Sequence, residues 1–206
     1  MKILLVSAGT KPGGSTERAM AEAEATLLSQ GATVEKLSLY ATEIATCGGC
    51  GACKKSGRCK HNDEATKLIE KAPDFDGYIF FSPVHYAGAA GSLKSAMSRL
   101  FISKKASLEY KPAAAVTVAR RGGNVTALEE ITRFFTFASM PIVSGNYPGI
   151  IHGGCAEDVE EDKEGLQTIR SIADNMVWLI RCIEAGKKLG IDRPIQEEKI
   201  KTSYIR

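Results

Sequence analysis

The sequence predicts an α/β fold in which a doubly wound parallel sheet of five strands carries helices on both faces. Short, almost uninterrupted apolar runs such as 77–81 and 112–119 are typical of parallel strands that are buried on both faces. Between such runs lie longer segments with apolar residues at helical spacing, for example 165–188. Strands that alternate with helices in this way form a parallel sheet with right-handed crossovers.

Length and composition fit one domain of that kind. The chain has 206 residues, of which 44% are hydrophobic and 25% charged, an ordinary globular mixture. We expect a single domain at 1–188, with a cysteine-rich insertion at 45–62 and a charged tail at 189–206. The net charge of +3 gives no reason to expect a nucleic-acid partner.

The apolar runs of the sequence lead us to expect a cytoplasmic protein. The opening apolar run, 3–6, is too short for the apolar region of a signal peptide, and no run approaches the length of a membrane span. Cysteines stay reduced in the cytoplasm, so clustered cysteines indicate metal binding or redox chemistry rather than disulfides.

The same patterns place the individual elements. Strands are expected at 2–7, 32–39, 77–81, 112–119 and 141–145, and helices at 16–30, 63–71, 92–103, 124–139 and 165–188. The segment 146–163 has little periodicity and is predicted to be a long loop, either a lid or a subunit contact.

The first loop, which joins a strand to a helix, is rich in glycine and hydroxyl side chains. Backbone N–H groups at a helix N-terminus form an anion site, and Ser15 or Thr16 can cap the helix or donate a hydroxyl group to a phosphate. A plain turn is an equally good interpretation of this composition. The loop matches neither the P-loop nor G-x-G-x-x-G, which argues against ATP and a Rossmann-bound dinucleotide. The candidate residues are Gly9, Thr10, Lys11, Ser15 and Thr16.

Two more loops follow buried strands. In the loop 82–88, Pro83 is expected to end the strand, so that His85 and Tyr86 stand at its carboxyl end. The run Arg120-Arg121-Gly122-Gly123 follows another strand and is either a second anion or polar-ring site or a solvated basic turn. Ligands of open parallel sheets bind at these strand ends, and a phosphorylated planar cofactor fits all three loops.

The four cysteines of the insertion carry the strongest chemical signal. Cys47, Cys50 and Cys53 are three residues apart with small residues between them, and Cys59 follows after a spacer that can turn at Gly57. Four thiolates satisfy a [4Fe–4S] cluster. A zinc site is the second interpretation, although the ligands of a four-cysteine zinc site usually come from two separated Cys-x-x-Cys pairs. A structural loop of reduced thiols is the third.

With these motifs in place, the chain resembles the flavodoxin-like NAD(P)H-dependent FMN reductase family and, within it, the iron–sulfur flavoproteins. The family's first loop usually reads Gly-Ser-Pro-Arg-x-Gly-Gly-Asn-Thr, and the matching run here is Ala8-Gly-Thr-Lys-Pro-Gly-Gly-Ser-Thr16. The opening residues and the asparagine differ, which weakens the match. Ser82-Pro-Val-His-Tyr86 matches the family's Ser-Pro-x-Tyr with a shifted aromatic residue.

The resemblance implies a flavodoxin-like fold, bound FMN and a role for each loop. The first loop holds the phosphate, Arg120 to Gly123 place N–H groups beside the flavin ring, and the four cysteines bind a [4Fe–4S] cluster. It also implies NAD(P)H as the substrate, an electron acceptor that is a small molecule or a ferredoxin-like protein, and a homodimer or homotetramer. The residues that pack on the ring edge are Pro83, Val84, His85, Tyr86 and Ala87.

We therefore predict an FMN-dependent oxidoreductase that passes electrons between NAD(P)H, or another low-potential donor, and a one-electron acceptor, with the [4Fe–4S] cluster as a possible intermediate carrier. No arrangement of side chains calls for a protein nucleophile, and no catalytic residue is assigned. Two other functions stay open. One is a non-enzymatic FMN electron carrier, and the other is a zinc-stapled binding protein without flavin.

Overall fold

A computed structural model of the chain describes residues 1–40, 42–198 and 200–204, and it confirms the predicted fold class. Five parallel strands form a sheet in the order β2-β1-β3-β5-β6, with the two-residue β4 paired antiparallel to β3. This is the flavodoxin-like order, whose switch point lies between β1 and β3. The strands are β1 Lys2–Ser7, β2 Thr33–Ser38, β3 Gly77–His85, β4 Gly88–Ala89, β5 Ala113–Ala119 and β6 Ile150–His152.

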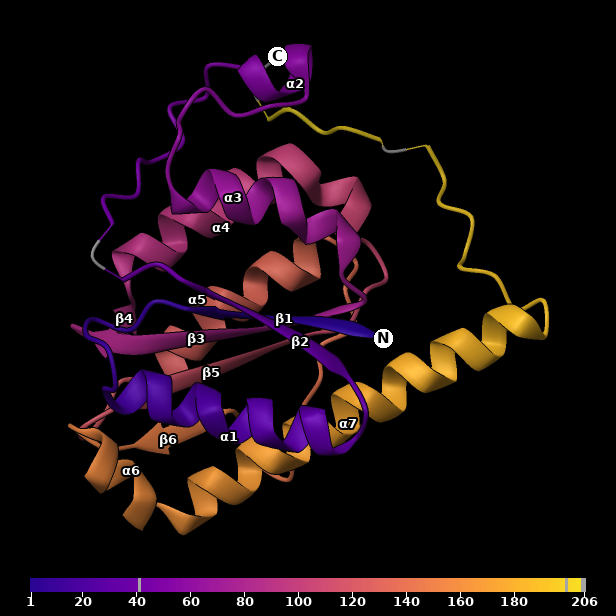
Figure 1. The fold of residues 1–206 in the computed structure, drawn as a ribbon. Coiled ribbons are helices and arrows are strands. Elements are labelled where there is room, and N and C mark those ends of the chain that lie inside the picture. The colour runs from indigo at the N-terminus through magenta and orange to yellow at the C-terminus, as the bar shows by residue number, and fades with distance from the viewer. Residues whose placement is uncertain (41, 199, 205–206) are drawn as a thin grey trace.

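Helices cover both faces of the sheet (Figure 1). One face carries α1 (Ser15–Ser29), α6 (Ala156–Glu161) and α7 (Lys163–Lys188). The other carries α3 (Glu64–Lys71), α4 (Gly91–Leu108) and α5 (Asn124–Phe137). The short α2 (Ala52–Ser56) lies within the cysteine-rich segment, and the 3-10 turn η1 (Ala72–Asp74) leads toward β3. No helix in the described part of the chain is long and apolar enough to span a membrane.

The strand β1 shows why two separate cores form. Its side chains alternate between the faces of the sheet, so Ile3 and Leu5 join the core under α1 and α7, whereas Leu4 and Val6 join the core under α3, α4 and α5. All four side chains are fully buried. A strand buried on both faces has no polar positions, which explains the continuous apolar runs in the sequence.

The strand that pairs with β5 at the edge of the sheet is not the predicted one. The expected strand at 141–145 forms only a single bridge, between Ala113 and Ile142, and the regular pairing with β5 is made instead by β6. Between these two contacts residues 144–149 are not part of a strand, although the Thr117 N–H still donates to the Gly149 carbonyl oxygen at 2.8 Å. Gly149 passes so close to β5 that a Cβ atom there would lie 2.1 Å from the Ala115 carbonyl oxygen. The predicted loop at 146–163 was therefore also wrong, since it contains β6 and α6.

Two local predictions about strand and helix ends were also wrong. Pro83 does not end β3, which continues to His85. Pairing between β1 and β3 stops at Phe81, so Pro83 lies beyond the last β1 partner, where a missing N–H is tolerated. Neither Ser15 nor Thr16 caps α1, because the N-cap position is Gly14 and it makes no side-chain cap bond.

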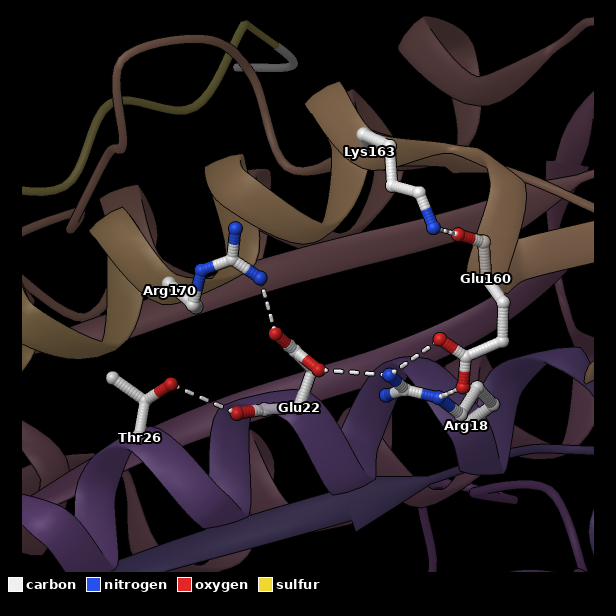
Figure 2. Close-up of polar contacts among 6 residues, drawn as sticks. All are labelled: Arg18, Glu22, Thr26, Glu160, Lys163 and Arg170. Carbon is white, nitrogen blue, oxygen red and sulfur yellow. Dashed lines mark hydrogen bonds and ion pairs between the residues drawn. The ribbon is translucent and has the colours of Figure 1, made fainter.

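A network of charges fixes α1 against α6 and α7 (Figure 2). Glu22 accepts hydrogen bonds from Arg18, at 2.9 Å, and from Arg170 of α7. Arg18 also binds Glu160 of α6. Burial alone raises the pKa of Glu22, but the bonds from Arg170 and Arg18 hold it below its ordinary value. The network therefore stabilises the position of the N-terminal half of α1, next to the first loop.

We predict that Glu22→Gln lowers stability at pH 7 by about 1 kcal/mol, since it removes a charge held between two arginines. A carboxyl group whose pKa is depressed in the folded state contributes stability above its unfolded pKa of about 4.3 and loses it as the pH falls through the folded value. The variant should therefore lose less stability than the wild type between pH 6 and pH 3. Thermal unfolding across that range measures both effects.

The matched control is Glu24→Gln on the same helix, which removes a more exposed ion pair with Lys36. Equal losses of stability in the two variants would contradict a special role for Glu22.

Candidate functional site

The loops that follow β1, β3, β5 and β6 meet at one edge of the sheet, on the left in Figure 1. The Ala8 N–H donates to the Phe81 carbonyl oxygen at 2.9 Å, which joins the ends of β1 and β3. A Cβ atom on Gly123 would lie 2.6 Å from the Ala87 Cα atom, so the loops after β3 and β5 are in contact. A Cβ atom on Gly154 would lie 3.5 Å from Arg120 Cγ, so the loop after β6 also contacts the loop after β5. The structure thus brings the three predicted loops together and adds a fourth, at 153–155, that was not predicted.

The first loop presents its polar groups around an uncapped helix. The Ser7 hydroxyl donates to Glu17 Oε1 at 2.6 Å and accepts from the Gly9 N–H at 3.1 Å, which turns the chain away from the sheet. Because Gly14 offers no side-chain cap, the first N–H groups of α1 remain available to an anion. Of the predicted residues, Thr10 and Lys11 are exposed, Ser15 is half-buried, and Gly9 and Thr16 are buried.

The second loop is a hairpin turn held in an unfavourable conformation. Tyr86 and Ala87 link β3 to β4 with φ angles of 49° and 59°. A two-residue hairpin turn of type I′ needs positive φ at both positions, and glycine, asparagine or aspartate usually supplies it. Residues other than these in the left-handed region are uncommon and tend to lie at functional sites. His85, Tyr86 and Ala87 are exposed, while Pro83 and Val84 are half-buried.

Glu130 of α5 holds this hairpin in place, and sequence reasoning missed it. Its Oε2 atom accepts a hydrogen bond from the Ala89 N–H at 2.8 Å and lies 3.2 Å from Lys94 Nζ. The bond from Ala89, and then Lys94, lowers the pKa of the Glu130 carboxyl group. On the other side, Ser82 Oγ accepts from the Ala90 N–H at 2.9 Å. The turn is therefore anchored from two elements that lie far apart in the sequence.

The third loop leads from β5 into α5. Gly123 is the N-cap of α5 with φ 92°, a conformation that suits glycine. The next residue, Asn124, is buried and donates from Nδ2 to the carbonyl oxygens of Thr117 and Ile151, at 3.1 and 3.3 Å. These bonds fix the loop to β5 and β6, so that Arg120, Arg121 and Gly122 are presented to solvent.

The cysteines lie elsewhere, beyond the α3–α4 face of the sheet (Figure 1). Cys47, Cys50, Cys53 and Cys59 line one cavity of about 150 Å³ together with residues of α4. The short α2 between them is flanked by Gly51 and Gly57, both at positive φ. In the described residues no three His, Cys, Asp or Glu side chains converge closely enough to hold a metal ion. The four thiols thus surround one cavity without meeting at one point.

A buried ion pair closes the base of the cysteine segment. Arg99 of α4 is only 2% exposed and donates from Nη1 to Asp63 Oδ2 at 2.5 Å and to the Ala45 carbonyl oxygen at 3.2 Å. Its Nη2 donates to Thr66 Oγ1 at 2.7 Å. Asp63 accepts in turn from the N–H groups of Ala45 and Thr66. Burial by itself raises the pKa of Asp63, but these hydrogen bonds hold it below its ordinary value.

Comparison with known proteins identifies the family. A profile of the NADPH-dependent FMN reductase family matches residues 1–153, about three quarters of the chain. The chain belongs to this family. Its members are FMN-dependent flavoproteins with oxidoreductase activity, and the fold and the converging loops agree with FMN as the bound group.

Individual relatives agree with the family. The chain is 31% identical to an iron–sulfur flavoprotein of Methanocaldococcus jannaschii over 89% of this chain and 100% of that one. It is 26% identical to an iron–sulfur flavoprotein of Methanosarcina thermophila over 91% of this chain and 99% of that one. The crystal structure of RosB with a bound formylriboflavin-phosphate intermediate superposes with a TM-score of 0.70 at 15% identity, over 100% of this chain and 94% of that one, which shows a shared fold.

We predict that Glu130→Ala weakens FMN binding roughly tenfold, because losing a hydrogen bond to a charged group costs about 1.4 kcal/mol or more and releases the hairpin. Titration of the FMN-free protein with FMN, followed by flavin fluorescence, measures the dissociation constant. The matched control is Glu129→Ala, one residue away on the exposed side of α5. If Glu130→Ala bound FMN as tightly as the control variant, the hydrogen bond between Glu130 and Ala89 would not shape the flavin site.

Proposed function

We propose that this protein is an FMN-dependent oxidoreductase that passes electrons between NAD(P)H and a one-electron acceptor, with a [4Fe–4S] cluster in the cysteine cavity. One observation carries the proposal. The same chain has loops that meet at the carboxyl edge of the sheet, where flavodoxin-like folds bind FMN, and a separate cavity lined by four cysteines. Relatives that match nearly the whole chain are named iron–sulfur flavoproteins.

The loop residues divide the binding of FMN between them. Thr10, Lys11 and the first N–H groups of α1 hold the phosphate, with Gly9, Ser15 and Thr16 shaping the turn. The hairpin residues Pro83 to Ala87 pack on the ring edge, and the 120–123 loop supplies N–H groups and positive charge beside the ring. Bound FMN supplies the chemistry that couples a two-electron donor to one-electron acceptors.

The cysteine cavity favours a cluster over a single ion. Four thiolates are the usual ligand set of a [4Fe–4S] cluster. A single water needs about 10–15 Å³ of cavity, whereas this cavity measures about 150 Å³. A cluster therefore suits the space better than a lone zinc ion, and the glycines of the segment would let the thiols close on it.

Cofactor analysis tests the proposal directly. We expect protein purified without oxygen to contain about one FMN and about four irons per chain, with sulfide to match. Cys53→Ser should lose most of the iron and keep the FMN, whereas Cys182→Ser, on the exposed face of α7, should keep both. FMN without iron in the wild type would remove the cluster from the proposal. Stoichiometric zinc without FMN would favour a zinc-stapled binding protein.

Activity measurements separate an enzyme from a carrier. We expect the purified protein to oxidise NADH or NADPH in the presence of a one-electron acceptor such as ferricyanide. A protein that is reduced by dithionite but oxidises neither nucleotide at a rate above that of free FMN would instead be a non-enzymatic electron carrier.

The proposal extends to partners and location. We infer a cytoplasmic homodimer or homotetramer whose acceptor is a small molecule or a ferredoxin-like protein, with no nucleic-acid or membrane partner. Sedimentation velocity tests the assembly, and a monomeric profile at micromolar concentration would contradict it.

A further inference from the structure

The cavity lined by the cysteines also contains two polar atoms that lack a partner. Among the described residues, the buried side-chain nitrogen and oxygen atoms without a hydrogen bond are Arg99 Nε and Ser103 Oγ. Both residues line the cysteine cavity. They lie four positions apart on α4, and residues at this spacing are neighbours on one helix face. An unsatisfied buried donor costs free energy, so two of them in one cavity point to an acceptor that belongs there.

The surroundings of Arg99 specify the charge of that acceptor. A guanidinium group stays protonated in proteins, so Arg99 carries a positive charge. Its two terminal nitrogens are engaged by Asp63, Ala45 and Thr66. Of the three guanidinium nitrogens, Nε is therefore the one without a hydrogen-bond partner.

Apart from the cysteine sulfur atoms, of which that of Cys59 interacts with Arg99, the residues around the cavity offer no charged acceptor for these donors. The lining includes Ile102, the glycines 48, 49 and 51, the cationic side chains Lys54 and Lys60, and His61. No carboxylate lies among the residues that line the cavity. A buried donor pair with cations at the rim suits a negatively charged group, and sulfur atoms of a thiolate-ligated cluster are negatively charged acceptors.

We propose that Arg99 and Ser103 donate hydrogen bonds to sulfur atoms of the cluster in this cavity and thereby raise its reduction potential. The inference rests on the cluster of the proposed function. The affected quantity would be the midpoint potential for one-electron reduction of that cluster, with reduced FMN of the proposed function as the electron donor. Donors aimed at sulfur stabilise the more negative, reduced form, so their removal makes reduction less favourable.

Arg99 has a second, positioning role in this arrangement. Its Nη1 atom binds one end of the cysteine segment at Ala45 and the other end at Asp63. A lysine at position 99 keeps the charge but cannot bind three partners in a planar fork and still offer an Nε–H group. The residue thus couples closure of the segment to the electrostatics of the cavity.

The test uses the full-length protein purified without oxygen and three variants on α4. Ser103→Ala removes one donor with little change in volume, and Arg99→Lys removes the other while keeping the charge. The matched control is Ser98→Ala, which removes a half-buried hydroxyl that binds the Lys94 carbonyl oxygen and does not line the cavity. FMN content reports whether each variant is folded, iron and sulfide analysis reports cluster occupancy, and a redox titration followed by electron paramagnetic resonance reports the cluster potential.

We expect Ser103→Ala to keep its iron and FMN. Its equilibrium constant for reduction of the cluster should fall at least tenfold, which is a shift of about 59 mV to a more negative potential for one electron. Arg99→Lys should keep FMN and lose more than half of the iron, or hold a cluster with a similarly lowered potential. Ser98→Ala should match the wild type in every measurement.

The outcomes separate this inference from the proposed function. If the wild type holds a cluster and both cavity variants match Ser98→Ala in iron content and potential, the hydrogen-bond inference alone is wrong. A wild type with FMN but no iron–sulfur cluster overturns both the inference and the cluster part of the proposed function.

Discussion

The burial of the central strands on both faces is the constraint on which the rest of this structure depends. The side chains of β1, β3 and β5 are almost completely enclosed along most of their length, so these strands offer no polar surface. Chemistry is therefore confined to the strand ends and to segments outside the sheet. The parallel order places the ends of β1, β3, β5 and β6 at one edge, which is where the four loops meet.

The helix α4 joins this edge to the cysteine cavity. It begins at Gly91, directly after the hairpin, and carries Arg99 and Ser103 further along. With a rise of about 1.5 Å per residue, Arg99 lies about 12 Å along the helix from its first residue. One rigid element thus positions both the anchor of the hairpin, through Lys94 and Glu130, and the base of the cysteine segment. A change in the packing of α4 would reach both regions.

The two regions differ in how their backbones are constrained. The hairpin at Tyr86 and Ala87 has an unfavourable backbone conformation that persists because Glu130 and Ser82 bind the adjacent N–H groups. The cysteine segment has little regular structure, and three of its glycines, Gly49, Gly51 and Gly57, adopt positive φ with open space where a Cβ atom would lie. It is closed at its base by Arg99 and Asp63 while its interior remains a cavity. A strained, fixed turn suits the orientation of a planar ring, whereas a loosely packed segment suits closure around a compact group.

The sequence by itself determined the fold class, the positions of most elements and the three loops, because apolar periodicity and glycine-rich turns are local properties. It also determined the cysteine spacing. It did not determine where the last strand pairs, since only contact with β5 favours 150–152 over 141–145. Nor did it reveal Glu130 or Arg99 as anchors, because their partners lie 41 and 36 residues away. Tertiary structure alone decided these features, since each depends on a contact between segments that lie far apart in the sequence.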